Sequence, residues 1–164
     1  MIKAVQRKAF RKPSNLRGYT LIELLAVLAV LSILLLAIWP LLDLNAERER
    51  EHELKRSLWE TRDAIDAYKK MSDLGALQGT ASGYPPNLQI LVTGAIDQRT
   101  GAVIYFLRRM PRDPFSDSSI SAEQSWGVRS YQSAALQPEA GVDVYDVFSK
   151  STVIALDGTP VSQW

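Results

Sequence analysis

The distribution of apolar and polar residues divides this chain into three parts. Residues 19–42 form an almost uninterrupted apolar run, with Glu23 as its single charged side chain. At 1.5 Å per residue, a helix over this run would be about 36 Å long, which is enough to cross the hydrocarbon core of a bilayer. We therefore expect a membrane-spanning helix over 19–42. We expect Pro40 to kink it, because proline removes one backbone hydrogen bond.

The polarity of the chain changes abruptly after this run. Residues 46–70 are rich in charged side chains and contain no glycine or proline. Apolar residues recur there at spacings of four, seven, three and three, which is typical of one face of a helix. This stripe consists of Leu54, Leu58, Ile65, Tyr68 and Met71. The pattern predicts one helix over about 19–72, with an amphipathic second half at 43–74 and Gly75 closing its C-terminal end.

The remaining residues, 75–164, read as a globular region. Glycine and proline are frequent over 75–101, which predicts a loop-rich linker with a short helix at 87–93. Three later segments mix aromatic and β-branched residues with polar ones, and a turn signal, Asp157-Gly158, follows the last of them. These strand candidates are 126–132, 142–148 and 152–156. A long helix packed on a small antiparallel sheet is an α+β fold.

Charge is distributed unevenly along the chain. The net charge is +1, but the first 18 residues hold six basic side chains and no acid, and 13 basic and 18 acidic side chains follow. The positive-inside rule places a basic leader in the cytoplasm and the chain after the apolar run across the membrane. A short basic segment before an apolar run is typical of targeting, so we expect no nucleic-acid partner. The chain has no cysteine, which excludes disulfides and thiolate chemistry.

The carboxylate of Glu23 is the most informative side chain in the apolar run. A carboxylate in hydrocarbon costs roughly 2.5–3.5 kcal/mol on insertion scales, so it marks a functional site by default. The nearest candidate partner is the α-amine that cutting the chain after Gly18 would create. Such an amine titrates near ~7.7–8.0 and would be cationic. The alternative is a tolerated polar residue near the end of the helix.

The segment around Gly18 resembles the class III signal of type IV pilins and of type II secretion pseudopilins. Gly18 is followed by Tyr19-Thr20-Leu21-Ile22-Glu23-Leu24, and Pro40 also falls where family members carry a proline. The resemblance implies that a membrane peptidase cuts between Gly18 and Tyr19, and that Tyr19 is then N-methylated. It also implies a salt bridge between Glu23 and the amine of Tyr19, in a neighbouring subunit or in the same chain. Tyr19 departs from the usual Phe but keeps an aromatic ring.

Two later segments are similar to G-type, or major, pseudopilins. They are Gly83-Tyr84-Pro85 with the leucines that follow, and the segment 105–115. Many major pilins close their C-terminal region with a disulfide, so the lack of cysteine also favours pseudopilins. An inserted serine-rich segment at 115–125 departs from the family pattern. The resemblance implies a type IV pilin-like fold and a structural subunit, not an enzyme.

Membership in this family would imply a mechanical function. The leader 1–18 would be removed by a prepilin peptidase that is also a methyltransferase. The chain would then cross the bacterial inner membrane once, with its N-terminus cytoplasmic and the region 75–164 in the periplasm. There it would join like and minor pseudopilins, on an inner-membrane secretion platform, in a pseudopilus that drives protein export across the outer membrane.

Two other functions compete with this interpretation. A minor pilin of a type IV pilus, serving motility, adhesion or DNA uptake, would share the same N-terminus. A membrane-anchored periplasmic binding module or enzyme would belong to a different class. Gly18 and Glu23 argue against that module, because a simple anchor needs neither residue.

A calcium site is the one cofactor hypothesis that the resemblance suggests. In G-type pseudopilins a calcium ion holds the C-terminal loop, and calcium takes six to eight oxygen ligands. The candidate ligands here are Asp143, Asp146 and Asp157, with Ser149 and Ser162 nearby in the sequence. These acids are spread over a strand and a turn, so solvated side chains are the competing interpretation.

Other polar and aromatic residues have simpler interpretations. His52 lies on a highly charged helix without a companion ligand, and we expect it to be solvated. A basic cluster could contact the helix acids at 47–53 of an adjacent subunit, or could belong to a surface loop. This cluster consists of Arg108, Arg109 and Arg112. We expect three of the four tryptophans, Trp59, Trp126 and Trp164, to serve in core or surface packing rather than in a ligand cage.

Overall fold

The computed structural model describes residues 18–134 and 137–164, and leaves the side chains of residues 36–43 undescribed. The chain divides into two compact units, Met1–Leu42 and Asp43–Trp164. One helix, α1 (Leu21–Asp73), contributes residues to both. The long N-terminal helix and the small antiparallel sheets that follow it confirm the predicted α+β, pilin-like fold.

Both ends of α1 are fixed by local hydrogen bonds. Its first residue is Leu21, two positions after the predicted start, because the preceding Thr20 is not helical and caps the helix. At the other end Gly75 has φ +70°, a conformation that glycine adopts without steric cost. The N–H of Gly75 donates to the carbonyl of Ser72 at 2.8 Å, and the next N–H donates to Met71 at 3.0 Å. These two bonds form a Schellman motif, which explains why the helix ends here.

The first unit presents apolar side chains around the whole described part of α1. From Leu21 to Leu35 every large apolar side chain is about half exposed or more. Within the described residues, no helix is both long enough and apolar enough to cross a membrane. The expected span at 19–42 includes residues whose side chains are not described. The kink predicted at Pro40 lies among these residues and stays a prediction.

The core of the second unit is built on the predicted stripe of α1. Leu54, Leu58, Ile65 and Tyr68 are all at most 2 % exposed, and Met71 packs against them. Residues from distant parts of the sequence cover this stripe, among them Leu91, Trp126, Val147 and Val161. Each fully buried side chain of this kind contributes about 1.5–3 kcal/mol to folding. The amphipathic half of α1 is therefore the spine of the globular region.

Two short antiparallel strand pairs accompany α1. β3 (Trp126–Arg129) pairs with β4 (Asp146–Ser149), and Val128 lies opposite Val147. β3 and β4 fall within or beside two of the predicted strand segments. Gly127 lies opposite Phe148, and a Cβ at Gly127 would come within 2.4 Å of the Phe148 ring, so no larger residue fits there.

The other elements differ in part from the sequence-based prediction. The third predicted strand, 152–156, is wrong, because the turn at Asp157-Gly158 folds the chain back at once and leaves a single bridge between Ile154 and Pro160. A second strand pair, β1 (Ala95–Ile96) with β2 (Val103–Ile104), instead begins within the predicted linker and ends just after it. The predicted short helix is confirmed as α2 (Gln89–Thr93). Two further short helices are α3 (Ala122–Ser125) and η1 (Val161–Gln163).

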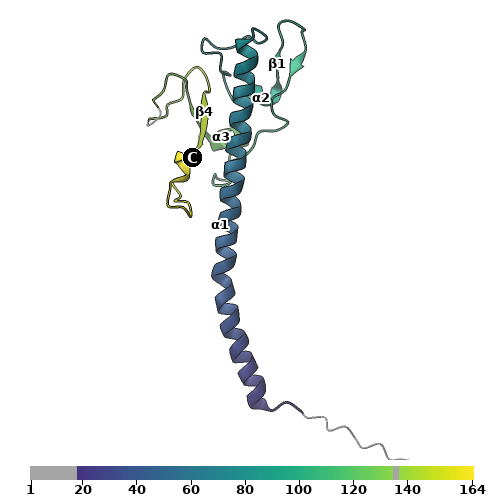
Figure 1. Ribbon diagram of the computed structural model, residues 1–164, viewed down its shortest axis with the longest axis vertical. Coiled ribbons are helices and arrows are strands. Elements are labelled where there is room, and N and C mark those ends of the chain that lie inside the picture. The colour runs from purple at the N-terminus through teal and green to yellow at the C-terminus, as the bar shows by residue number, and fades with distance from the viewer. Residues whose placement is uncertain (1–17, 135–136) are drawn as a thin grey trace, which may run out of the picture. The chain divides into compact units, whose positions relative to one another are not determined.

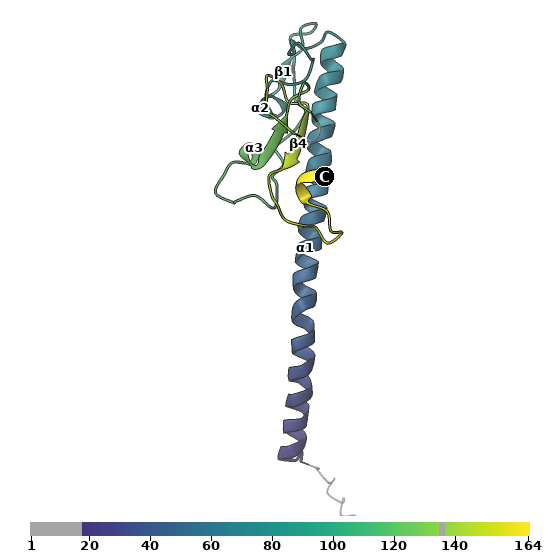
Figure 2. The same ribbon diagram turned by 90° about the vertical axis from the view of Figure 1, so that its left-hand side faces the viewer.

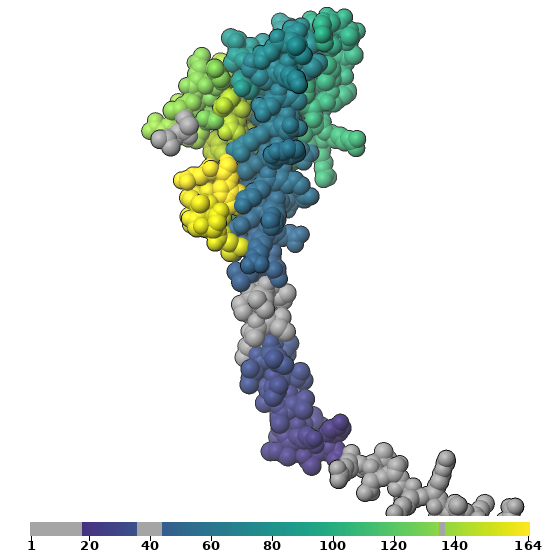
Figure 3. All heavy atoms as spheres, viewed as in Figure 1, coloured from purple at the N-terminus to yellow at the C-terminus, as the bar shows by residue number. Residues whose placement is uncertain are grey.

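The C-terminal segment lies against α1 in both ribbon views (Figures 1 and 2). Figure 3 shows its atoms, in yellow, in contact with the helix. Three polar side chains of α1 attach it. The Glu51 carboxylate accepts the N–H of Leu156 at 2.6 Å, Lys55 Nζ lies 4.1 Å from the Trp164 ring centroid, and Arg62 binds the backbone oxygen of Trp164 at 2.8 Å.

Candidate functional site

The predicted cleavage site lies just outside the first turn of α1. Gly18 and Tyr19 are not helical, and the Tyr19 side chain is 82 % exposed. Within the described residues, a Cβ built on Gly18 would meet no atom within 4 Å. The described contacts therefore do not require glycine here, and the predicted cleavage after Gly18 stays a prediction.

Glu23 occupies the third position of α1. Its backbone N–H donates to the hydroxyl of Thr20 at 3.3 Å, which makes Thr20 the N-cap. Thr-Leu-Ile-Glu thus matches the sequence of a capping box. A carboxylate in this first turn is stabilised by the positive end of the helix dipole. The sequence interpretation missed this role of Thr20, although the Thr-x-x-Glu spacing signals it.

The ion pair expected for Glu23 is not formed within the described residues of a single chain. None of their ion pairs includes Glu23. In the uncut chain, Tyr19 offers a peptide N–H and no amine. The pair with Tyr19 therefore stays a prediction about the cleaved protein.

The described part of α1 in the first unit has an apolar surface on all sides. Figure 3 shows this segment in purple. Eleven large apolar side chains over residues 21–35 are 49–80 % exposed. Their transfer out of water is favourable by about 25 cal/mol per Å². Lipid, or the helices of other copies, would have to cover this surface.

One comparison with known proteins bears directly on this segment. Residues 13–39 match the family model of the prokaryotic N-terminal methylation motif. The chain carries a prepilin-type methylation motif. The motif indicates a type IV pilin-like or pseudopilin-like protein, and it includes Gly18, Tyr19 and Glu23. A search of curated proteins and a search of solved structures each gave no match.

The methylation motif has three further implications. It implies processing by a prepilin peptidase, a membrane-anchored N-terminal helix and assembly into pilus-like filaments. Proteins with this motif are typically structural subunits. The bare apolar surface of α1 and the exposed bond after Gly18 are the features that such processing and assembly would use.

The three predicted calcium ligands have separate hydrogen-bond partners. Asp143 is buried, and its carboxylate accepts hydrogen bonds from the Ser82 hydroxyl and, at 2.9 Å, from the Tyr131 N–H. Burial alone raises the pKa of Asp143, but hydrogen bonds from Ser82, Tyr131 and Ser130 outweigh it, so the pKa is lowered. Exposed Asp157 accepts two hydrogen bonds from Thr159, and these lower its pKa.

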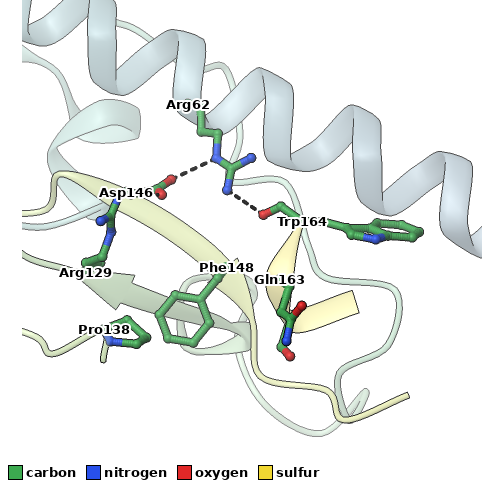
Figure 4. Close-up of a pocket in the computed structure, with 8 residues that line it drawn as sticks. Arg62, Arg129, Pro138, Asp146, Phe148, Gln163 and Trp164 are labelled. Atoms are coloured by element: carbon green, nitrogen blue, oxygen red, sulfur yellow. Dashed lines mark hydrogen bonds and ion pairs between the residues drawn. The ribbon is translucent and has the colours of Figure 1, made fainter. Parts of the chain in front are cut away.

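Asp146 lies between two guanidinium groups (Figure 4). Its Oδ1 accepts from Arg62 Nε at 2.8 Å, and its Oδ2 accepts from Arg129 at 3.1 Å. Cations already occupy both oxygens, so this carboxylate does not fit a calcium site. Among the described residues, no group of three or more acidic or histidine side chains is placed to hold a metal. The geometry gives the calcium hypothesis no support.

The basic cluster is divided between two roles. Arg112 donates to the carbonyl of Ile120 at 2.6 Å and also to that of Asp117, so it holds the inserted segment in place. Arg108 and Arg109 line a surface groove beside Glu60 and Asp63 of α1.

The structure gives the positions of His52 and of three tryptophans for which the sequence made predictions. His52 is exposed, as expected. Trp126 is in the core, and Trp164 packs against the core and under Lys55. Trp59 is 71 % exposed, so it is not part of the core, and surface packing is the interpretation that is left for it.

Proposed function

We propose that this chain is a pseudopilin of a type II secretion system, which assembles through α1 into a periplasmic pseudopilus. One observation carries the proposal. The first part of α1, residues 21–35, exposes large apolar side chains and carries a single carboxylate, Glu23, four residues after the proposed new N-terminus at Tyr19. Such a helix has no stable place in water, and parallel copies of it would bury one another's apolar surfaces.

The carboxylate supplies the register of this packing. After cleavage, the positive amine of Tyr19 and the negative side chain of Glu23 attract each other strongly in an apolar environment. Leaving either charge unpaired there costs several kcal/mol, so subunits would be accepted only where the two charges meet. The hydrogen bond that the Thr20 hydroxyl accepts from the Glu23 N–H keeps the first turn ordered, and Tyr19 precedes the helix.

The lack of cysteine and the resemblance to G-type pseudopilins favour secretion over a pilus. In this proposal the peptidase is a partner that processes the chain, the inner-membrane platform extracts it from the bilayer, and like and minor subunits surround it. The chain's own contribution to export is mechanical.

Glu23→Gln tests the proposal, because it removes the charge and keeps the shape. We expect the variant to be cleaved to the same mature mass and to remain in the membrane without forming filaments. Glu139→Gln, which removes an exposed carboxylate from the globular region, is the matched control and should assemble normally. Filaments from Glu23→Gln at the wild-type level would refute the role of the charge pair. Export measured in the same strains separates a secretion subunit from a pilus subunit.

A further inference from the structure

A groove of about 570 Å³ lies among α1, β3, β4 and η1, far in sequence from the methylation motif. Figure 4 shows its residues. Arg62 comes from α1, Arg129 from β3, and Asp146 and Phe148 from β4. Gln163 from η1 closes the opposite side. A concave site of this size with a few convergent polar groups is the usual form of a small-ligand site.

The two arginines are held in fixed positions. Asp146 binds one guanidinium with each carboxylate oxygen and accepts the N–H of Val147 at 2.8 Å as well. Arg62 is fixed further, because it donates to the carbonyl of Val147 at 3.0 Å and to the backbone oxygen of Trp164. Side chains ordered in advance lose little entropy when they bind a ligand.

Both guanidinium groups keep donors for another acceptor. Each has five N–H donors. Arg129 uses one nitrogen, for Asp146, and its other N–H groups have no hydrogen-bond partner within the described residues. Only 18 % of the Arg129 side chain is exposed, and the guanidinium also lies 4.8 Å from the Tyr145 ring centroid. A partly buried guanidinium with free donors is a favourable site for a carboxylate, which it can bind with two parallel hydrogen bonds.

The unused donors of Arg129, and not a surplus of positive charge, would attract an anion. Asp146 binds both guanidinium groups, and Arg62 also donates to the backbone oxygen of Trp164, the last residue of the described chain. Nearby Lys55 and Asp66 carry opposite charges. A carboxylate would therefore be held by charge-assisted hydrogen bonds from Arg129.

Apart from the charged groups, the groove is lined by the apolar rings of Phe148, Pro138 and Trp164 and by the polar side chains of Ser162 and Gln163. The Phe148 ring and the Pro138 ring lie near each other below the charged groups in Figure 4. We propose that this groove binds a carboxylate that is joined to an apolar group, with the carboxylate on Arg129 and the apolar group against Phe148. The shared chemistry fits a small aromatic acid or the terminal residue of a peptide.

The full-length protein in lipid nanodiscs allows a direct test by NMR of the tryptophan indole N–H groups. Trp164 borders the groove, and its indole donates to the Thr159 hydroxyl at 2.8 Å. Trp126 binds the carbonyl of Pro111 instead and serves as the internal control. We expect 3-phenylpropanoate to shift the Trp164 signal in a saturable way and to leave the Trp126 signal unchanged. The neutral 3-phenylpropanamide should bind about tenfold more weakly or worse, since it lacks the charge.

A second pair of probes distinguishes the sources of the carboxylate. Gly-Gly-Phe with a free terminus should bind, and its amidated form should not. Tighter binding of the free peptide than of 3-phenylpropanoate would assign the groove to chain termini, and equal binding would assign it to small acids. Both results support a carboxylate site.

Substitutions provide the decisive outcomes. Arg129→Gln should weaken binding about tenfold or more, and Arg129→Lys, which keeps the charge, should retain part of it. Arg99→Gln removes an exposed arginine that pairs only with Asp97 at 3.5 Å, and it should bind like the wild type. Equal binding of acid and amide, or unchanged binding by folded Arg129→Gln, would overturn the proposal. The absence of any saturable Trp164 shift in the unsubstituted protein would overturn it as well.

Discussion

The hydroxyl of Ser149 in β4 donates a hydrogen bond to Oδ2 of Asp113 at 2.6 Å, and both side chains are buried. Oδ1 of the same carboxylate accepts the N–H of Phe115 at 2.8 Å. Ser149 and Asp113 are 36 residues apart in the sequence. One carboxylate thus joins the start of the inserted segment to the central strand pair.

Asp113→Ala should lower the free energy of unfolding by about 2–4 kcal/mol. The substitution leaves the Ser149 hydroxyl and the Phe115 N–H without an acceptor, and each unsatisfied buried group costs about 1–3 kcal/mol. Urea denaturation of the full-length protein in detergent measures the loss. Glu139→Ala, at an exposed site, should stay within about 0.5 kcal/mol of wild type. Equal losses for the two variants would contradict a special role for Asp113.

Tyr68→Phe should leave stability unchanged or raise it by up to about 1 kcal/mol. The Tyr68 hydroxyl is buried, and it has no hydrogen-bond partner in the described structure. Burial also raises the pKa of this phenol. Removal of an unsatisfied polar group relieves its desolvation cost and keeps the ring beside Phe106, whose centroid lies 5.4 Å away.

Thermal unfolding checks the Tyr68 prediction. A gain of 1 kcal/mol corresponds to a rise in Tm of about 2–4 °C for a domain of this size. Tyr105→Phe, at an exposed position, is the control and should not change Tm. A clear fall in Tm for Tyr68→Phe would show that the hydroxyl has a stabilising partner, such as a buried water.

Acid should weaken the fold in part through Asp143. The pKa of its carboxyl is lower in the folded protein than its ordinary value of 3.8. A lowered folded pKa contributes stability that is present above the unfolded pKa and is lost as the pH falls through the folded pKa. We therefore expect the denaturation midpoint to fall progressively below about pH 4.

Asp143→Asn should reduce this dependence on pH, because the amide does not titrate. The reduction is partial, since hydrogen bonds also lower the pKa values of Asp97, Asp117 and Asp157. The denaturation midpoints of the wild type and of Asp143→Asn, measured between about pH 5 and pH 3, give the slope of midpoint against pH for each protein. Identical slopes for the wild type and the variant would show that Asp143 does not contribute to the loss of stability in acid.

Gly18→Val should leave the leader attached when the protein is expressed with a prepilin peptidase. No atom of the described residues lies within 4 Å of a Cβ added at Gly18, so we expect the fold to tolerate valine and the peptidase to reject it. Mass spectrometry of the product reads the result, and Gly101→Ala in the β1–β2 turn is a control that should be cleaved normally. A mature chain that begins at Tyr19 in Gly18→Val would contradict the assigned cleavage site.

The sequence predicted those parts of the fold that depend on neighbouring residues. The stripe from Leu54 to Met71 repeats with the helical period, and Gly75 is a local stop signal, so α1 and its buried face could be anticipated. Strands of two residues, such as β1 and β2, have no period to detect. The segment 152–156 has the composition of a strand, but the turn after it leaves room for only one bridge.

The methylation motif and the groove differ in the same way, because one is contiguous in the sequence and the other is not. Gly18, Tyr19 and Glu23 are contiguous, so the spacing of the motif could be read directly. Arg62 and Asp146 are 84 residues apart, and nothing near either of them indicates that they meet. The groove therefore emerged only from the structure, whereas its partner residue Asp146 had been interpreted as a metal ligand.

Some contacts of α1 join residues that are far apart in the sequence, and this separation has a consequence for biosynthesis. Glu51, Arg62 and Lys55 find their partners near the end of the chain, and the first two bonds join residues 105 and 102 positions apart. The ribosome releases the helix well before those partners exist. Because contacts of such separation form slowly and late, the globular unit cannot finish folding until residues 156–164 have been synthesised. Until then, the apolar stripe of α1 from Leu54 to Met71 lacks the C-terminal residues that cover it.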